Sequence, residues 1–357
     1  MLEYISFSLQ LLSSNKKTMA AKASLFLMFN TTDFIESIFK SNLNNFDELA
    51  LQAFTYQFEN NVVYQQYCKL NKILDKQSVT EVAQIPFLPI QFFKNKQIVC
   101  NNEPTEMVFT SSSTSGTGES SHYVTNLKVY NQAFTKGFEQ FYGNIKDYCF
   151  LALLPSYMER KGSSLILMCD ELIKSSKHPL SNFYLHNHQQ LFEVLTELKR
   201  KNQKTILLGA TFGLLDFAEN FKIDFPELIV METGGMKGRK KEITRYEIHS
   251  ILQNGFGVNK IHSEYGMTEL LSQAYSYGNG LFECPNWMQV KISDNTDPFC
   301  FVNENKSGVL NVIDLANINS CCFIQTQDIG RMNNKKQFEV LGRLDFSDVR
   351  GCSLLTV

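Results

Sequence analysis

Short apolar runs alternate with segments of helical periodicity through the middle of the 357-residue chain. Residues 148–154, 205–208 and 227–231 have the length and apolar composition of buried strands. Residues 187–201 and 240–253 carry their apolar side chains at helical spacing. This alternation predicts an α/β fold with a substantial parallel sheet, because parallel strands need a long crossover between them.

The two ends of the chain have a different texture from the middle. Apolar residues recur at spacings of three and four over residues 33–74, which predicts two or three amphipathic helices. Prolines in residues 85–90 favour an extended passage. Short strands and turns are expected after residue 281, with strands at residues 308–313 and 338–341. We predict three parts. Residues 1–29 form a poorly ordered or over-called extension, residues 30–281 an α/β core with a helical lead-in, and residues 282–357 a β-rich subdomain.

Composition excludes several classes of protein. A hydrophobic fraction of 43% can fill a core, and a formal net charge of -2 provides no basic field for nucleic acid. No run of 18 apolar residues is present, so we expect no membrane span. The nine cysteines include no CxxC pair, which predicts a reduced, cytoplasmic protein without structural zinc.

A stretch rich in serine and threonine, residues 110–122, follows a short apolar segment. Its hydroxyl groups and unhindered backbone amides can surround anionic oxygens, and its glycines permit close approach. No Walker pattern is present, because no Gly-Lys-Ser/Thr follows. Taken alone, the stretch fits a flexible surface loop as well as a phosphate loop. The candidate phosphate-binding residues are Ser112, Ser113, Thr114, Ser115, Gly116 and Thr117.

Two further segments could hold a purine and a metal ion. Gly234 and Gly235 follow the predicted strand at residues 227–231, where side-chain-free residues let a flat base lie against the backbone, although such turns are common. The second segment, residues 265–269, can supply an aromatic ring for the base, a hydroxyl group for phosphate and a carboxylate for Mg²⁺. A plain helix start at its Thr-Glu pair is the alternative. Its residues are Tyr265, Gly266, Met267, Thr268 and Glu269.

Asp328 lies in a polar stretch that we predict to be a turn after a strand. Its carboxylate could accept hydrogen bonds from both ribose hydroxyls, and the guanidinium of Arg343 could reach the sugar or a phosphate. Either residue alone would fit an ordinary β-hairpin. The order of these polar segments along the chain indicates an enzyme that forms an acyl-adenylate from ATP and a carboxylic acid. Its predicted catalytic residues are Thr268 and Glu269, and Glu269 would also hold Mg²⁺.

Together these motifs resemble the adenylate-forming superfamily of acyl-CoA synthetases, luciferases and peptide-synthetase adenylation domains. Within it, several segments are similar to the acyl-protein synthetase (LuxE-type) family of bacterial fatty acid reductase systems. The resemblance covers roughly residues 30–357 and implies the large N-terminal domain of the superfamily, with its C-terminal lysine-bearing domain absent. Ser113 departs from the pattern, because glycine is usual there. The similar segments are residues 85–94, 154–157, 234–239 and 350–354.

The family resemblance implies a role for Cys352, which lies five residues before the end of the chain. A thiolate can attack an activated acyl carbon, so the implied reaction passes the acyl group of a fatty acid through Cys352 to a cysteine of a reductase partner. A buried structural cysteine is the alternative. Two other functions stay open: a phenylacetate-type CoA ligase, and a nucleotide-binding scaffold without turnover.

Overall fold

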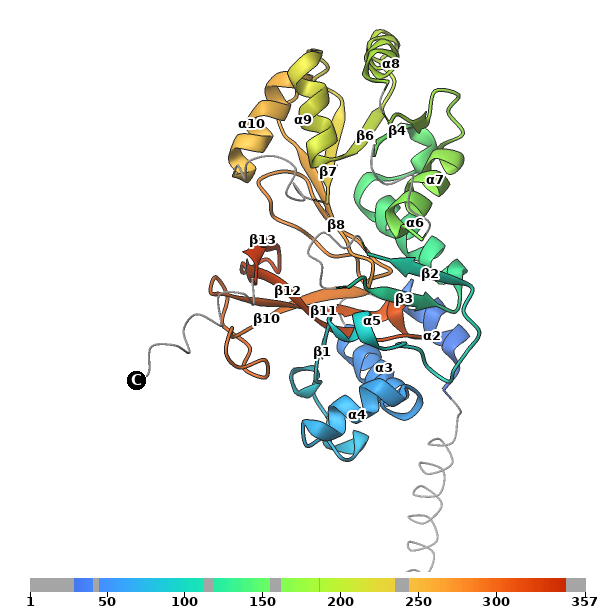
Figure 1. Cartoon of the computed structure of the whole chain (residues 1–357), viewed down its shortest axis with the longest axis vertical. Helices are drawn as coiled ribbons and strands as arrows, with labels where there is room; N and C mark the ends of the chain where they lie inside the picture. Colours follow the sequence, from blue (N-terminus) through green and yellow to red (C-terminus); the bar gives the residue numbers. More distant parts are fainter. Residues whose placement is uncertain are drawn as a thin grey trace, which may run out of the picture.

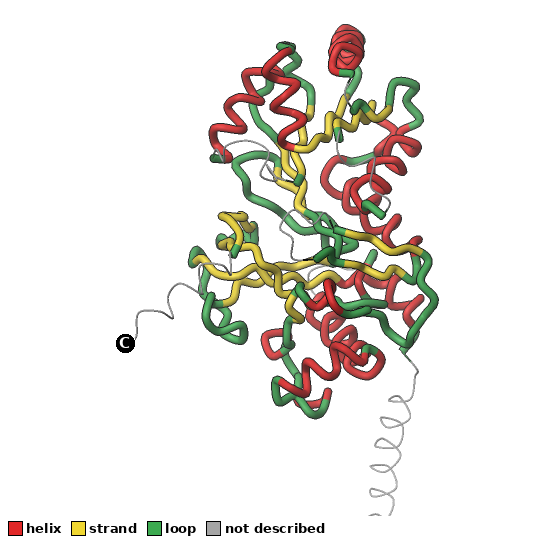
Figure 2. The backbone as a smooth tube through the Cα atoms, in the orientation of Figure 1, coloured by secondary structure: helices red, strands yellow, loops and turns green. Residues whose placement is uncertain are grey.

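The computed structural model describes residues 29–40, 45–111, 118–154, 162–185, 187–234 and 244–344. Two larger sheets and a hairpin organise this part of the chain (Figures 1 and 2). Residues 1–28 of the predicted extension at residues 1–29, the candidate loop residues Ser112–Thr117, and both Gly235 and Cys352 lie outside the described residues. No described helix is long and apolar enough to cross a membrane.

The first sheet has the strand order β5-β4-β6-β7-β8-β9, and its strands run parallel except for the antiparallel β9. Side chains of β4 and β6 alternate between two apolar clusters, one on each face of the sheet. Helices α6 and α7 cover one face, and α8, α9 and α10 cover the other (Figure 1). The predicted parallel α/β core is confirmed. The strands are Cys149–Leu153 (β4), Asn182–Phe183 (β5), Thr205–Ala210 (β6), Ile229–Thr233 (β7), His262–Tyr265 (β8) and Ala274–Ser276 (β9).

Two of the five described helices of this core were predicted: α8 agrees with the prediction for residues 187–201, and α10 overlaps the predicted helix at residues 240–253. Capping explains several of the starts: the Thr244 side chain accepts a hydrogen bond from the backbone N–H of Glu247, and the Glu247 carboxylate accepts one from the backbone N–H of Thr244. Gly257 ends α10 in the left-handed conformation, with φ of 67°. The helices are Leu127–Tyr142 (α6), Ser164–Ser176 (α7), His188–Arg200 (α8), Thr211–Asn220 (α9) and Arg245–Phe256 (α10).

The second sheet has the order β1-β12-β11-β10, and β13 also pairs with β12. Its β1 strand comes from the proline-containing passage near the N-terminus, and it runs parallel to β12. The predicted strands at residues 308–313 and 338–341 are confirmed as β11 and β13. The strands are Leu88–Pro89 (β1), Met288–Ser293 (β10), Ser307–Asp314 (β11), Phe323–Met332 (β12) and Phe338–Arg343 (β13).

The helical lead-in packs against the second sheet, not against the parallel one with which the sequence groups it. Buried Gln57 on α3 donates hydrogen bonds to the carbonyls of Asn317 and Ile318 and accepts one from the backbone N–H of Cys322. Figure 1 shows α3 and α4 beside this sheet, and a domain boundary at residue 281 stays a prediction. The lead-in helices are Thr31–Ile38 (α2), Phe46–Asn60 (α3), Val62–Leu70 (α4) and Phe92–Asn95 (α5).

A two-stranded hairpin joins these parts. Met107–Thr110 (β2) pairs antiparallel with Ser121–Val124 (β3), and the candidate phosphate loop connects the two strands. Ser111 and Ser120 close the base of that loop, because the Ser111 N–H donates to the Ser120 carbonyl at 3.0 Å and the Ser120 N–H donates to Ser111 Oγ at 2.9 Å. The hairpin therefore fixes both ends of the predicted phosphate loop.

Candidate active site

A cavity of about 630 Å³ lies where the carboxyl ends of β7 and β8 meet β12 and β13. The carboxyl ends of strands are where open α/β sheets usually bind ligands. Every described residue that the sequence assigned to the site lines this cavity: Gly234, Tyr265, Gly266, Met267, Thr268, Glu269, Asp328 and Arg343. The structure thus brings segments of the chain that are far apart in sequence into one site.

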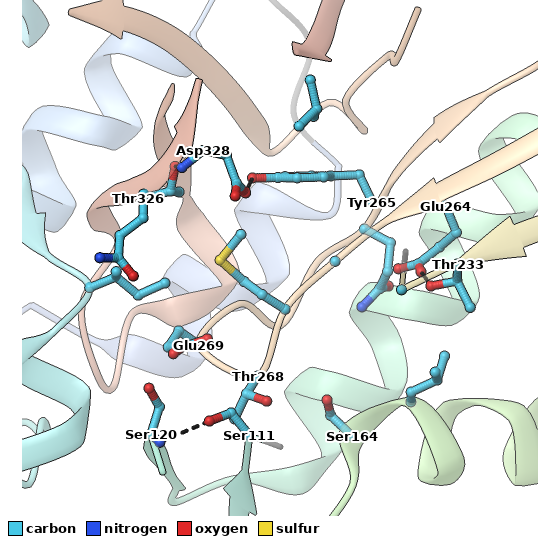
Figure 3. A pocket seen from close by; sticks show the side chains of 18 of the residues that line it. Ser111, Ser120, Ser164, Thr233, Glu264, Tyr265, Thr268, Glu269, Thr326 and Asp328 are labelled. Atoms are coloured by element: carbon cyan, nitrogen blue, oxygen red, sulfur yellow. Dashed lines mark hydrogen bonds between the residues drawn. The ribbon is translucent and has the colours of Figure 1, made fainter. Parts of the chain in front are cut away.

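Tyr265 and Asp328 form one side of the cavity. The Tyr265 hydroxyl donates a hydrogen bond to Asp328 Oδ2 at 2.8 Å (Figure 3). Behind it, the tyrosine ring packs against the rings of Phe282 and Phe338, with centroids 5.8 and 5.4 Å away. Burial raises the pKa of Asp328, while the Tyr265 hydrogen bond and the charge of Arg343 oppose this shift.

Asp328 does not lie in a turn, as the sequence predicted. It lies within β12, directly opposite Arg343 of β13. The strand continues through the polar stretch because Thr326 is buried and donates a hydrogen bond to the Leu310 carbonyl of β11. Cross-strand pairing, not a local turn, therefore places the carboxylate and the guanidinium at one cavity wall.

Thr268 and Glu269 occupy a turn, so the alternative prediction of a helix start is wrong. Other elements hold the backbone of this turn: the Thr268 carbonyl lies 3.0 Å from His122 Nδ1, and the Glu269 carbonyl accepts from Asn317 Nδ2 at 2.8 Å. Just beyond it, the N–H groups of Leu271 and Ser272 donate to one oxygen of buried Asp314. These bonds fix the turn in front of the hairpin.

The Glu269 side chain is buried at 5% exposure but still lines the cavity. Burial raises its pKa; a hydrogen bond from Ser120 and the charge of Arg343 lower it, and the charge of Asp328 raises it further. Figure 3 shows Glu269 between the Tyr265–Asp328 pair and the serines of the hairpin. A cation at this carboxylate would offset the cost of burying its charge.

Glu269 suits a magnesium ion that takes its other ligands from phosphate and water. Within the described ranges, no group of three or more His, Cys, Asp and Glu side chains could hold a metal ion by itself. Mg²⁺ commonly binds through one or two carboxylates together with substrate phosphates. The donors present therefore fit a metal that arrives with a nucleotide, and they do not form an all-protein metal centre.

His122 of β3 lies behind the Thr268 turn and does not line the cavity. Its Nδ1 is near the Thr268 carbonyl, and its Nε2 is 2.9 Å from Ser320 Oγ. Burial lowers its pKa to about 4, which keeps the ring neutral at pH 7. A neutral ring that donates from Nδ1 and accepts at Nε2 satisfies both contacts.

Removing this support should affect both stability and the site. We expect His122→Ala to lower the free energy of unfolding by about 1–3 kcal/mol, because two buried hydrogen-bond partners lose their contact. Urea unfolding measures that loss. Ligand binding should weaken at the same time through displacement of Thr268, and His122→Gln should restore part of both. Wild-type unfolding and binding in His122→Ala would contradict this role.

Several polar residues at the ends of β7 and β8 were not predicted from the sequence. Glu232 accepts hydrogen bonds from Ser263 Oγ and Thr211 Oγ1 and lies 2.9 Å from His249 Nε2, and the net effect of its surroundings is a lowered pKa. Glu264 follows on β8 and accepts a hydrogen bond from the Thr233 hydroxyl. A carboxylate inside the largely apolar β7 is the signal that could have identified Glu232, whereas the polar sequence of β8 gives no such signal for Glu264.

The fold defines the class of protein. The chain has the fold of adenylate-forming ligases: it aligns with an open conformation of 2-hydroxyisobutyryl-CoA ligase at a TM-score of 0.63 and 12% identity, covering 84% of this chain and 70% of that one. An ATP-bound chimera of the ligases MatB and BclM aligns at a TM-score of 0.51 and 12% identity, covering 66% and 47%. The predicted fold class is confirmed.

Sequence comparisons then show which proteins the chain is similar to. Residues 12–155 match the model of the acyl-protein synthetase family LuxE. Over 333 residues the chain is 21% identical to a long-chain-fatty-acid--luciferin-component ligase of Aliivibrio fischeri, covering 86% of each. Over 70 residues it is 36% identical to the ligase of the same name from Photorhabdus luminescens, covering 19% of this chain and 59% of that relative. The resemblance to LuxE-type acyl-protein synthetases is confirmed.

Proposed function

We propose that this protein is an ATP- and Mg²⁺-dependent ligase that converts a fatty acid into its acyl-adenylate and then passes the acyl group to a protein thiol. One observation carries the proposal: Tyr265, Glu269 and Asp328, which lie up to 63 residues apart in sequence, line the same cavity. The LuxE match and the two related fatty acid ligases support the choice of acid.

In this proposal each wall of the cavity would bind a different part of ATP. Asp328 and Arg343 face the cavity together and would bind the ribose, with the base near Tyr265 and Gly234. Thr268, Ser111 and Ser120 present hydroxyl groups where the phosphates would lie (Figure 3). Glu269 would hold Mg²⁺, which when bound neutralises charge that develops on the phosphates.

In the first step a carboxylate oxygen of the acid attacks the α-phosphorus of ATP, and the bond from that phosphorus to pyrophosphate breaks. In the second step the Cys352 thiolate attacks the acyl carbon, and AMP leaves with the electrons of the acyl–oxygen bond. The resulting thioester would then exchange with a cysteine of a reductase partner. Transfer to CoA, as in phenylacetate-type ligases, is the competing second step.

Fatty acid-dependent exchange of labelled pyrophosphate into ATP tests the first step, because only a reversible adenylation moves the label. We expect exchange with a long-chain acid in the presence of Mg²⁺ and none after chelation with EDTA. A protein that binds ATP but supports exchange with no carboxylic acid would be a nucleotide-binding scaffold, which would overturn the proposal.

The ribose contact gives a separate prediction. Asp328→Asn keeps the shape of the side chain but removes its charge, so the KM for ATP should rise roughly 10- to 100-fold, the loss expected for a hydrogen bond to a charged group. The KM for the acid should change little. A matched control is Asp216→Asn, whose side chain does not line the cavity. An unchanged KM for ATP in Asp328→Asn would remove Asp328 from the ribose site.

A further inference from the structure

Glu264 lies in the cavity but outside the part assigned to the nucleotide. It precedes Tyr265 on β8, and neighbouring residues of a strand point to opposite faces. Figure 3 shows Glu264 beside Thr233, away from Asp328 and from the Glu269 side chain. The Glu264 carboxylate itself makes none of the proposed ATP contacts.

The Glu264 carboxylate is buried, and few neighbouring groups stabilise its charge. Glu264 is 8% exposed. Burial raises the pKa of its carboxyl to about 7, although the hydrogen bond from Thr233 acts to lower that pKa. No ion pair joins Glu264 to a Lys, Arg or His within the described ranges. Burying a carboxylate in this way costs free energy unless another group comes to it.

Gln273 provides a second, independent indication of a ligand. This side chain is 6% exposed and lines the same cavity, yet its buried Oε1 has no hydrogen-bond partner. An unsatisfied buried amide oxygen costs about 1–3 kcal/mol. Native structures contain few such atoms, and each one calls for an explanation.

Gly266 places the two groups side by side. A Cβ at Gly266 would contact Glu264 Oε1 and would lie 3.4 Å from Gln273 Cγ. The absence of a side chain there leaves the Glu264 carboxylate and the Gln273 side chain beside one space. The Gln273 amide oxygen and the ionised form of Glu264 are both acceptors, so a hydrogen-bond donor would satisfy both.

The residues around Glu264 indicate that the hydrogen-bond donor belongs to the carboxylic acid substrate. Apolar Leu165 and Met168 of α7 line the cavity, as does the ring of Tyr130, and these can contact a hydrocarbon chain. Cys169 of α7 is close enough for the Glu264 charge to raise the pKa of its thiol further above its usual range. A plain hydrocarbon chain in this space would leave both Glu264 and Gln273 without a partner.

We infer that the preferred acid carries a hydroxyl or amino group on its chain, and that this group donates hydrogen bonds to Glu264 and Gln273. The inference rests on the proposed adenylation and narrows its substrate class. A hydroxyl and an ammonium group share the donor chemistry. They differ in charge, and a charge-neutral substitution of Glu264 can therefore separate them.

The test measures acid-dependent pyrophosphate exchange with dodecanoic acid and with dodecanoic acids that carry a hydroxyl group at the second, third or terminal carbon, or an amino group at the terminal carbon. For the wild type, kcat/KM should be at least about tenfold higher with one substituted acid than with dodecanoic acid, because a site built to bind a polar group rejects the analogue that lacks it. Glu264→Leu and Gln273→Leu should each reduce or reverse that preference.

Glu264→Gln distinguishes the two donors. If the wild type prefers a hydroxy-substituted dodecanoic acid, that preference should largely survive Glu264→Gln. If it prefers the amino-substituted dodecanoic acid, the preference should be lost together with the negative charge. Thermal unfolding of each variant checks the fold, and Gln273→Leu serves if Glu264→Leu does not fold. Equal kcat/KM for all the acids in the wild type, or a preference unchanged in Glu264→Leu and Gln273→Leu, would overturn this inference. Exchange with no acid would instead overturn the proposed function.

Discussion

Glu269→Gln should reduce fatty acid-dependent pyrophosphate exchange roughly 1,000-fold, the largest loss of rate expected from a single substitution in the described residues. Glutamine keeps the size of the side chain and its place beside Ser120 but lacks the charge that would hold Mg²⁺ at the phosphates. Because burial already disfavours the ionised form, removing the charge should leave thermal stability unchanged or slightly higher.

A matched control separates this effect from a general loss of acidic charge. Glu193→Gln changes the same chemical group on the exposed surface of α8, and it should exchange pyrophosphate at the wild-type rate. Titration of Mg²⁺ adds a second readout, since Glu269→Gln should need a higher concentration for half-maximal exchange. Exchange within about threefold of wild type at ordinary Mg²⁺ would remove Glu269 from the metal site.

Cys352→Ser should abolish stable acyl transfer and spare adenylation. With labelled fatty acid, ATP and Mg²⁺, the wild-type protein should acquire a label that neutral hydroxylamine releases, as expected for a thioester. The variant should lose that label and keep pyrophosphate exchange, because the thiol acts only after the adenylate has formed. Gel fluorography measures the label, and mass spectrometry locates it.

Cys300→Ser is the control for this experiment, because Cys300 is an exposed free thiol away from the cavity. It should label as well as the wild type. A hydroxylamine-sensitive label that persists in Cys352→Ser would remove the terminal thiol from the reaction. Release of acyl-CoA on addition of CoA would instead favour the phenylacetate-type alternative.

Strands β4, β6 and β7 and helices α8 and α10 could be predicted because each carries a local signal. The strands are apolar and short, and the two helices have clear periodicity and capping residues. The Tyr265–Glu269 segment was found because its residue types match a chemical task in a fixed order. The prediction that Asp328 and Tyr265 share one site also depended on the chemistry of nucleotide binding, because no spacing in the sequence indicates it.

Other features depend on contacts that no local pattern encodes. Asp328 was assigned to a turn because polar residues are frequent in turns, whereas its strand is stabilised by pairing on both sides. Glu264 and Gln273 carry no periodic signal, and their place in the cavity depends on the packing of β8 against β7 and on the turn after Tyr265. The lead-in helices pack on the second sheet through partners that only the tertiary fold supplies.

The hydrogen bonds from Gln57 to Asn317, Ile318 and Cys322 have a consequence for how the chain matures. They connect positions about 260 residues apart, so α3 cannot reach its native partners until Cys322 has left the ribosome. Contacts of such high sequence separation slow folding, and in the meantime the apolar face of α3 is uncovered. Chaperone assistance during synthesis would protect that face from aggregation.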